Sequence, residues 1–238
     1  MKERKISKKE LEKILKNHSL WLKSKGKKGE RADFSHCWLY GLDEDGNEEK
    51  LNLEGAVLDY ADFSFAILTE VKLYRTSLKH ADFTGASFDG CMRLYGTNFS
   101  SAKLIGTSFN QANITSVNFE SADLRSAKFD RSSLDLVNFD FANLQGANFN
   151  GTRLSYTAFG EANVKDAWFS SLELNGYSMK MHIDDEQAQK MMYFVLKLIE
   201  HSKNISKETK EICKIKKIID FANKYDWAEN DAVRLIEK

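Results

Sequence analysis

A large apolar residue recurs at every fifth position over much of the chain. Counting from Leu53, 25 successive marked positions reach Leu174 without a polar residue, with one extra residue between Phe88 and Leu94. A period of five fits neither the 3.6-residue turn of an α-helix nor the two-residue alternation of a strand. The pattern therefore predicts a repeat architecture in which each five-residue unit forms one side of a coil.

The other positions of the unit also follow a rule. The residue two places before the marked position is Ala in 13 of the 25 units, and the residue just before it is often Asp or Asn, as in Ala122-Asp123-Leu124. Both apolar residues can then point inward, while Asp or Asn bonds the backbone at a corner. Columns taken every 20 residues are alternately aliphatic and Phe from Leu94 onward, which fits a four-sided coil; a ten-residue period is also compatible. The predicted core ladders comprise Leu94, Phe99, Leu104, Phe109, Ile114, Phe119, Leu124, Phe129, Leu134, Phe139, Leu144 and Phe149.

The repeated unit A-(D/N)-(L/F)-x-x resembles that of the pentapeptide repeat proteins, over residues 31–180. The resemblance implies an all-β solenoid, a right-handed quadrilateral β-helix. Seven coils at the usual inter-strand spacing would form a rod of roughly 30–35 Å. The chain contains no Pro, which suits such a coil because each Pro would remove one ladder hydrogen bond.

The two ends of the repeat region follow helical patterns. Residues 1–30 are predicted to form a basic N-terminal capping helix and linker, with a capping box at Ser7 and Glu10 and the helix itself over 8–23. A loop or hairpin is expected at about 41–51, and a one-residue bulge at about 91–93. Residues 181–238 are predicted to form a C-terminal helical subdomain, whose spare face could dock a second copy as a homodimer or another protein.

Charge separates the same regions. The whole chain has 35 basic and 35 acidic residues, but residues 1–30 carry a net charge of +7 and residues 31–180 a net charge of −7. Three distant Cys residues indicate a reducing, cytoplasmic location. The five His residues show no metal-ligand spacing, and Asn freely replaces Asp at the repeat corners, which argues against acid–base catalysis. We therefore expect neither an enzyme nor a cofactor nor a metal.

The outward positions suggest binding to an unidentified protein partner. The predicted function is a non-catalytic protein-interaction scaffold, because aromatic residues favour interface cores. The alternative is a DNA-mimicking binder of a type II topoisomerase (gyrase), as the resemblance to Qnr-type quinolone-resistance proteins implies, although the acidic columns are broken by Lys and Arg. Direct nucleic-acid or membrane binding through the basic head is not expected. The candidate interaction surface comprises Asp59, Tyr60, Tyr74, Tyr95, Glu120, Asp140, Phe141, Tyr156 and Glu161.

Overall fold

The computed structural model describes residues 2–42, 47–69, 71–91, 94–169 and 173–175. The chain divides into two compact units, Met1–His182 and Ile183–Lys238. The predicted C-terminal helical subdomain at 181–238 lies outside the described residues. The described fold therefore belongs to the first unit.

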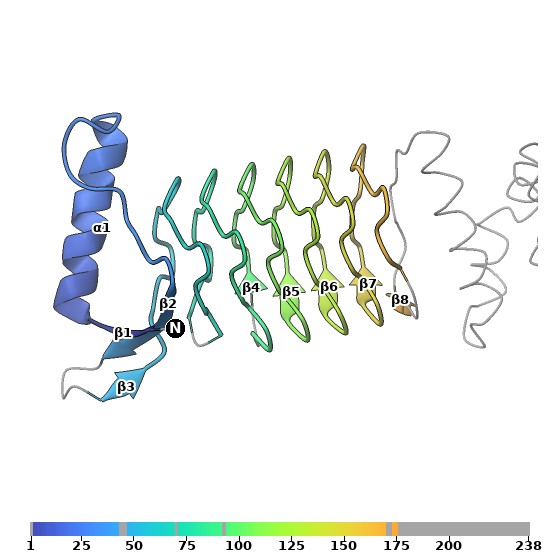
Figure 1. Ribbon diagram of the computed structural model, residues 1–238, viewed down its shortest axis with the longest axis horizontal. Coiled ribbons are helices and arrows are strands. Elements are labelled where there is room, and N and C mark those ends of the chain that lie inside the picture. Colours follow the sequence, from blue (N-terminus) through green and yellow to red (C-terminus); the bar gives the residue numbers. More distant parts are fainter. Residues whose placement is uncertain (1, 43–46, 70, 92–93, 170–172, 176–238) are drawn as a thin grey trace, which may run out of the picture. The chain divides into compact units, whose positions relative to one another are not determined.

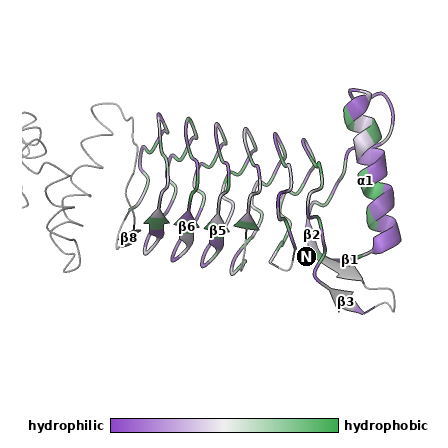
Figure 2. Ribbon diagram, turned by 180° about the vertical axis from the view of Figure 1, so that it is seen from behind, coloured by the Kyte–Doolittle hydropathy of each residue, from purple (hydrophilic) through white to green (hydrophobic). Residues whose placement is uncertain are grey.

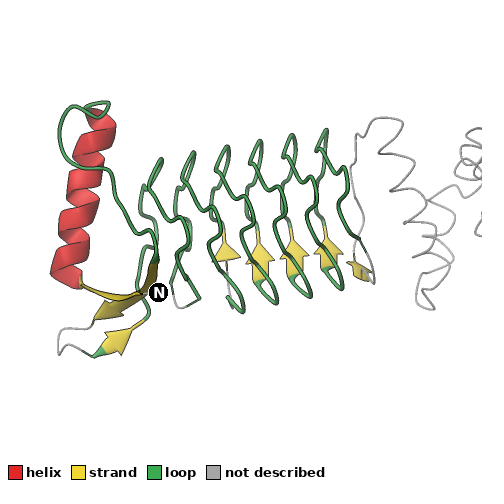
Figure 3. Ribbon diagram, in the orientation of Figure 1, coloured by secondary structure: helices red, strands yellow, loops and turns green. Residues whose placement is uncertain are grey.

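The first unit is a solenoid of short parallel strands with one helix at its N-terminal end (Figures 1 and 3). Its two sheets have the strand orders β1-β2-β3 and β4-β5-β6-β7-β8. All pairs are parallel except that of β2 with β3. The elements are β1 (Lys2–Ser7), α1 (Lys8–Lys23), β2 (Cys37–Leu42), β3 (Glu48–Glu49), β4 (Leu94–Tyr95), β5 (Asn113–Thr115), β6 (Ser133–Asp135), β7 (Arg153–Ser155) and β8 (Glu173–Asn175).

Each coil has four sides, because four parallel bridges recur in every 20 residues. In one coil the bridged pairs are Asn118 with Asn138, Asp123 with Asn143, Lys128 with Asn148, and Ser133 with Arg153. This register excludes the ten-residue coil that the sequence left open. We number the sides by their inward residues: side 1 holds Leu94, Ile114, Leu134 and Leu154; side 2 holds Phe99, Phe119, Phe139 and Phe159; side 3 holds Leu104, Leu124, Leu144 and Val164; and side 4 holds Phe109, Phe129, Phe149 and Phe169.

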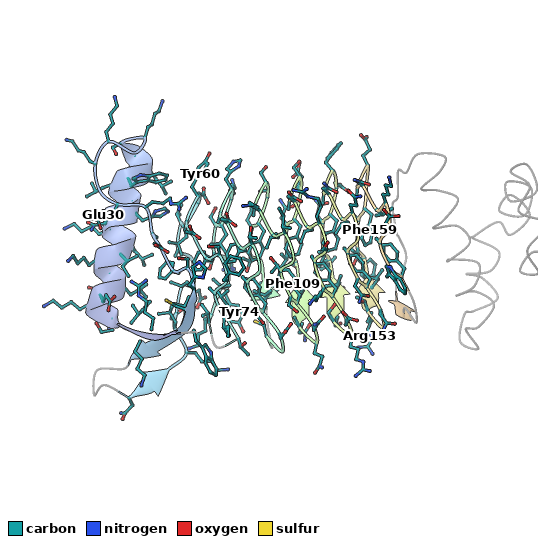
Figure 4. The ribbon with its side chains drawn as sticks, viewed as in Figure 1. Glu30, Tyr60, Tyr74, Phe109, Arg153 and Phe159 are labelled. Atoms are coloured by element: carbon teal, nitrogen blue, oxygen red, sulfur yellow. The ribbon has the colours of Figure 1, made fainter. Side chains whose placement is uncertain are left out.

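The core consists of these inward columns, and all twelve residues of the predicted ladders are fully buried. Within side 2 the rings stack from coil to coil, with centroids 5.1 Å apart for Phe119 and Phe139. Across the interior, Phe119 meets the edge of Phe109 on side 4 at 5.7 Å. Stacked and edge-to-face contacts are the two favourable geometries for aromatic pairs, so each ring is held on several sides. Figure 4 shows Phe109 and Phe159 inside the coil.

Asp and Asn side chains shape the coil as the repeat pattern predicts. The Oδ1 atom of Asn118 accepts a hydrogen bond from the backbone N–H of Glu120, two residues further on (2.9 Å). Asp62 does the same for Ser64 (2.9 Å). Since either side chain provides this acceptor, the exchange of Asp for Asn reflects a structural role in the turn.

The N-terminal end differs from the prediction of a helix and linker alone. Residues Lys2–Ser7 form strand β1, which pairs in parallel with β2 of the first coil. This strand satisfies backbone groups that an open coil edge would leave unpaired, and it buries Ile6. Arg4 donates to the Asp33 carbonyl (2.7 Å) and covers the Phe34 ring, with its guanidinium carbon 5.8 Å from the ring centroid.

Helix α1 has the bounds 8–23 that its capping box predicts, and the Ser7 side chain accepts from the Glu10 N–H (3.2 Å). The helix contains both hydrophilic and hydrophobic residues, which Figure 2 shows as purple and green segments of α1. Its fully buried His18 contacts the first coil, where the Ala32 N–H donates to Nδ1 of His18 (3.1 Å). The chain returns close over the helix at Gly29, where an added Cβ would lie 2.2 Å from the Asn17 carbonyl oxygen.

The contact of His18 makes the attachment of α1 sensitive to pH. Burial lowers the pKa of His18 below its ordinary value of 6.5, against an opposing effect of Asp59. Below that value the unfolded chain takes up a proton that the folded one does not, so stability falls with falling pH. We expect the urea-unfolding free energy to decrease as pH drops from about 7.5 to 5.5, and His18→Asn, which keeps an acceptor without titrating, to reduce this slope. An unchanged slope in the variant would contradict the assignment.

The chain departs from the five-residue count near 41–51 and near 91–93. Gly41 and Leu42 of β2 pair in antiparallel fashion with Glu49 and Glu48 of β3, so the first insertion contains a hairpin whose residues 43–46 lie outside the described part. The extra residue falls between Cys91 and Leu94, because the Asn113 N–H donates to the Cys91 carbonyl while Leu94 aligns with Ile114. The Cys91 side chain next to this extra residue is buried.

Candidate interaction surface

The nine candidate surface residues fall on two adjacent sides of the coil. Tyr74 and Tyr95 occupy neighbouring coils on side 1, and Tyr156 stands at the corner between sides 1 and 2. The others lie on side 2 or on its far corner: Asp59, Tyr60, Glu120, Asp140, Phe141 and Glu161. In Figure 4, Tyr60 lies on the same edge of the coils as the C-terminal end of α1, and Tyr74 lies on the opposite edge.

The two residues nearest the N-terminus have structural partners. The Asp59 Oδ1 atom accepts from the Ser77 hydroxyl (2.6 Å) and from the Lys79 N–H (3.0 Å). Tyr60 stacks on His80, with centroids 4.7 Å apart, and meets Trp21 of α1 edge-on at 6.3 Å. Both side chains therefore help to join successive coils or to seat the helix.

Tyr74 and Tyr95 line a hollow on side 1. The hollow measures about 370 Å³, and the described residues that line it are Tyr74, Leu94, Tyr95, Asn113 and Thr115. Its described lining offers hydroxyl and amide groups of the kind that orient ligands, but it holds only two of the nine candidate residues, so we turn to side 2.

The remaining candidates cluster on three successive coils of side 2, together with one residue that the candidate set omitted. Leu136 precedes Tyr156 by one coil at the same corner, where the Leu136 N–H donates to the Ser155 carbonyl. Leu136, Phe141 and Tyr156 are 54%, 56% and 48% exposed. We call this set the side-2 patch: Glu120, Leu136, Asp140, Phe141, Tyr156 and Glu161.

The apolar residues of the side-2 patch adopt a backbone conformation that does not suit them. Leu136, Phe141 and Tyr156 have φ values of 55°, 61° and 47°, in the left-handed region. This region costs a residue with a side chain about 1–2 kcal/mol, and glycine occupies it freely. Gly96 occupies the corner of Leu136 and Tyr156 two coils before Leu136. The same left-handed corner recurs throughout the repeat, as at Tyr60. Among the described residues, Phe141 and Tyr156 lack the ring contacts that Tyr60 makes, so these exposed side chains add little to folding.

The carboxylates of the side-2 patch also differ from those of side 3. On side 3, Asp82 pairs with Lys103 at 3.0 Å, and the Arg125 guanidinium lies 2.7 Å from Asp123 and lowers the pKa of that carboxyl. Within the described part of the chain, Glu120, Asp140 and Glu161 make no ion pair. The three coil segments that carry the patch, 116–121, 136–141 and 156–161, contain no Lys or Arg. Asp140 also joins two coils, because its Oδ1 atom accepts from the Gly160 N–H (2.6 Å), as Asp59 does for Lys79. The patch is thus an acidic surface without a cation and with apolar corners, whose outermost carboxylates are Glu120 and Glu161.

Sequence reasoning overlooked other exposed apolar residues. Trp168, which is 70% exposed, takes the position just before the inward residue of side 4 and bridges to Asn148. Val57 is also exposed at that position of its unit. The outward direction of this position in the repeat would have identified both, because it alternates with the inward Phe or Leu.

The described residues offer no constellation for metal chemistry. No group of three His, Cys, Asp or Glu side chains among them could hold a metal ion. The helix α1 is neither long nor apolar enough to cross a membrane, and the same holds for any helix in the described ranges.

A four-sided coil of five-residue units, with outward patches and buried Leu and Phe columns, defines a class of repeat solenoids. A family model described as "Pentapeptide repeat region" matches residues 61–139 and 81–159. Residues 61–159 of the chain are thus a pentapeptide repeat region. No curated protein sequence matches it significantly.

Several solved structures resemble the chain at low identity. HetL, involved in heterocyst differentiation regulation in the cyanobacterium Nostoc sp. strain PCC 7120, is 22% identical over 63% of this chain and 78% of its own, with a TM-score of 0.28. A trypsin-treated form of QnrB1, a plasmid-mediated fluoroquinolone resistance protein, is 20% identical over 70% and 82%, with a TM-score of 0.37. Rfr23 from the cyanobacterium Cyanothece 51142 is 21% identical over 53% and 85%, with a TM-score of 0.22. At these scores they carry no argument about function.

Proposed function

We propose that this protein is a non-catalytic binding scaffold whose side-2 patch takes up a protein partner. The observation that supports the proposal is the coincidence of three exposed apolar residues at left-handed corners with three carboxylates that lack a cation. Apolar and aromatic side chains form the centre of protein interfaces, and charges around them select the partner. A partner with apolar side chains among basic ones would fit this surface.

The proposal favours a protein partner over mimicry of DNA. Side 2 presents one carboxylate per coil at Glu120, Asp140 and Glu161, a spacing of about 4.8 Å. Duplex DNA carries one charge per ~1.7 Å, and gyrase binding would rest on a much denser column. Arg4, one basic residue of the head, contacts Asp33 and Phe34 and therefore has a structural role. The right-handed sense of the coil, the cytoplasmic location and a homodimer through the C-terminal helices stay predictions.

The test is capture of partners from the native cell extract by immobilised full-length protein. The patch variant replaces Leu136, Phe141 and Tyr156 with Gly, which fits their φ values and removes their side chains. The matched control replaces Ser101, Ser116 and Ser121 with Gly, at corners with φ values of 56°, 55° and 57°. We expect a protein that the wild type and the control capture at equal levels, and the patch variant at less than about one tenth of that level. Equal capture by all three proteins would contradict the proposal.

A further inference from the structure

Helix α1 exposes a row of basic side chains on the face away from the coil. Lys9, Lys13, Lys16, Leu20 and Lys23 follow one another at intervals of four, three, four and three residues, which places them on one face of the helix. All five are exposed, and Leu20 is 43% exposed in their midst. We call this set the lysine stripe.

The lysine stripe is positioned by the same contacts that attach α1 to the coil. His18, which accepts the Ala32 N–H, lies on the opposite face of the helix, so the stripe points away from the first coil. Among the described residues, Lys13, Lys16 and Lys23 make no ion pair, although Glu12 borders them. The stripe therefore presents a rigid line of unpaired cations interrupted by one apolar side chain.

This chemistry is the complement of the side-2 patch. The patch offers three carboxylates without cations and three apolar corners, and the stripe offers four ammonium groups and Leu20. We propose that the lysine stripe of one copy binds the side-2 patch of a second copy. The inference rests on the proposed function, because it names the partner of that same patch.

The dimensions of the two surfaces are compatible. From Lys13 to Lys23 the helix rises about 15 Å, and the carboxylates of Glu120, Asp140 and Glu161 span two coil spacings, about 10 Å. Lysine side chains are long and flexible enough to take up the difference. Leu20, between the lysines, would then lie against the apolar corners of the patch.

The contact cannot form within one copy, because α1 packs on the first coil and the patch begins several coils further along. The lysine stripe and the side-2 patch are different surfaces of the protein, so their association is heterologous. Heterologous contacts that do not close produce open chains of molecules. The structure thus favours head-to-side chains whose length depends on concentration and on salt.

Sedimentation velocity of the full-length protein tests the inference. At low ionic strength we expect the average mass to rise with concentration, and to return to that of the monomer at about 0.5 M salt because salt screens exposed charges. The head variant reverses Lys13, Lys16 and Lys23 to Glu, and the side variant reverses Glu120 and Glu161 to Lys. Each alone should associate more than about tenfold more weakly than the wild type.

A mixture provides the decisive arm of this experiment. The acidic head of the head variant matches the basic side of the side variant, so mixing the two should restore association. The control variant reverses Lys25, Lys27 and Lys28 to Glu, which makes the same change of net charge outside the stripe, and it should associate like the wild type. The inference is overturned by a monomeric wild type at low salt, by equal loss in the control, or by a mixture that stays monomeric. If the wild type is monomeric while capture through the patch succeeds, only the inference fails and the proposed function stands.

Discussion

Phe119→Asp should unfold the repeat region. Phe119 is fully buried, stacks on Phe99 and Phe139 at 5.2 and 5.1 Å, and meets Phe109 edge-on. Loss of a buried Phe side chain alone costs about 3–5 kcal/mol, and an unpaired carboxylate in the same place adds a large desolvation penalty. The total rivals the whole stability of a typical domain, about 5–15 kcal/mol. Circular dichroism and urea titration of the purified variant measure the effect.

The matched control is the neighbouring outward residue. Asn118→Asp keeps the side-chain oxygen that accepts the Glu120 N–H, and Asp already plays this part at Asp62 and Asp123. Its unfolding free energy should stay within about 1 kcal/mol of the wild type. A folded Phe119→Asp protein with the β-helical spectrum of the wild type would contradict the inward assignment of the five-residue period.

Lys128→Pro should be the second most damaging change. The Lys128 N–H donates to the Thr107 carbonyl at 2.9 Å, in a ladder that continues from Ser108 through Lys128 to Asn148. Proline removes this donor from a central coil and restricts Ala127 before it, at a cost of about 3 kcal/mol or more. The free energy of unfolding in urea provides the measurement.

Lys128→Thr serves as the control for the proline substitution, since it shortens the exposed side chain and keeps the N–H group. It should unfold within about 1 kcal/mol of the wild type. Similar stability of the Pro and Thr variants would show that the absence of Pro has no connection with the ladders.

The five-residue period predicts the coil well because each unit is locally determined. An inward Phe or Leu and a small inward residue recur in each unit, and an Asp or Asn acceptor bonds the backbone two residues further on, as Asn118 does for Glu120. The capping box of Ser7 and Glu10 likewise predicts the start of the helix over 8–23. These features need no knowledge of distant residues.

The features that sequence reasoning missed depend on distant pairing. Strand β1 contains one apolar residue, Ile6, and forms because the open edge of β2 needs a partner. The burial of His18 depends on Ala32, fourteen residues away. Likewise, Tyr60 is an outward aromatic in the repeat pattern, and only the position of Trp21 shows that it supports α1.

The candidate surface was predicted in part for the same reason. Outward positions follow from the repeat, so Phe141 and Tyr156 are recognisable as exposed residues. Their left-handed backbone recurs at the same position along the repeat. The unpaired state of Glu120 and Glu161 depends instead on which side chains the register of neighbouring coils brings near them. The sequence therefore locates the residues, while the structure separates those that support the fold from those available for binding.

The central claim is that the apolar corners of the side-2 patch serve binding rather than folding. The most direct measurement is the urea-unfolding free energy of the Leu136→Gly, Phe141→Gly, Tyr156→Gly variant, compared with its capture of partners. Relief of the left-handed strain opposes the entropy that glycine adds to the unfolded chain, so stability should stay within about 1 kcal/mol of the wild type or above it while capture is lost. A clear loss of stability, or full stability with undiminished capture, would contradict the account.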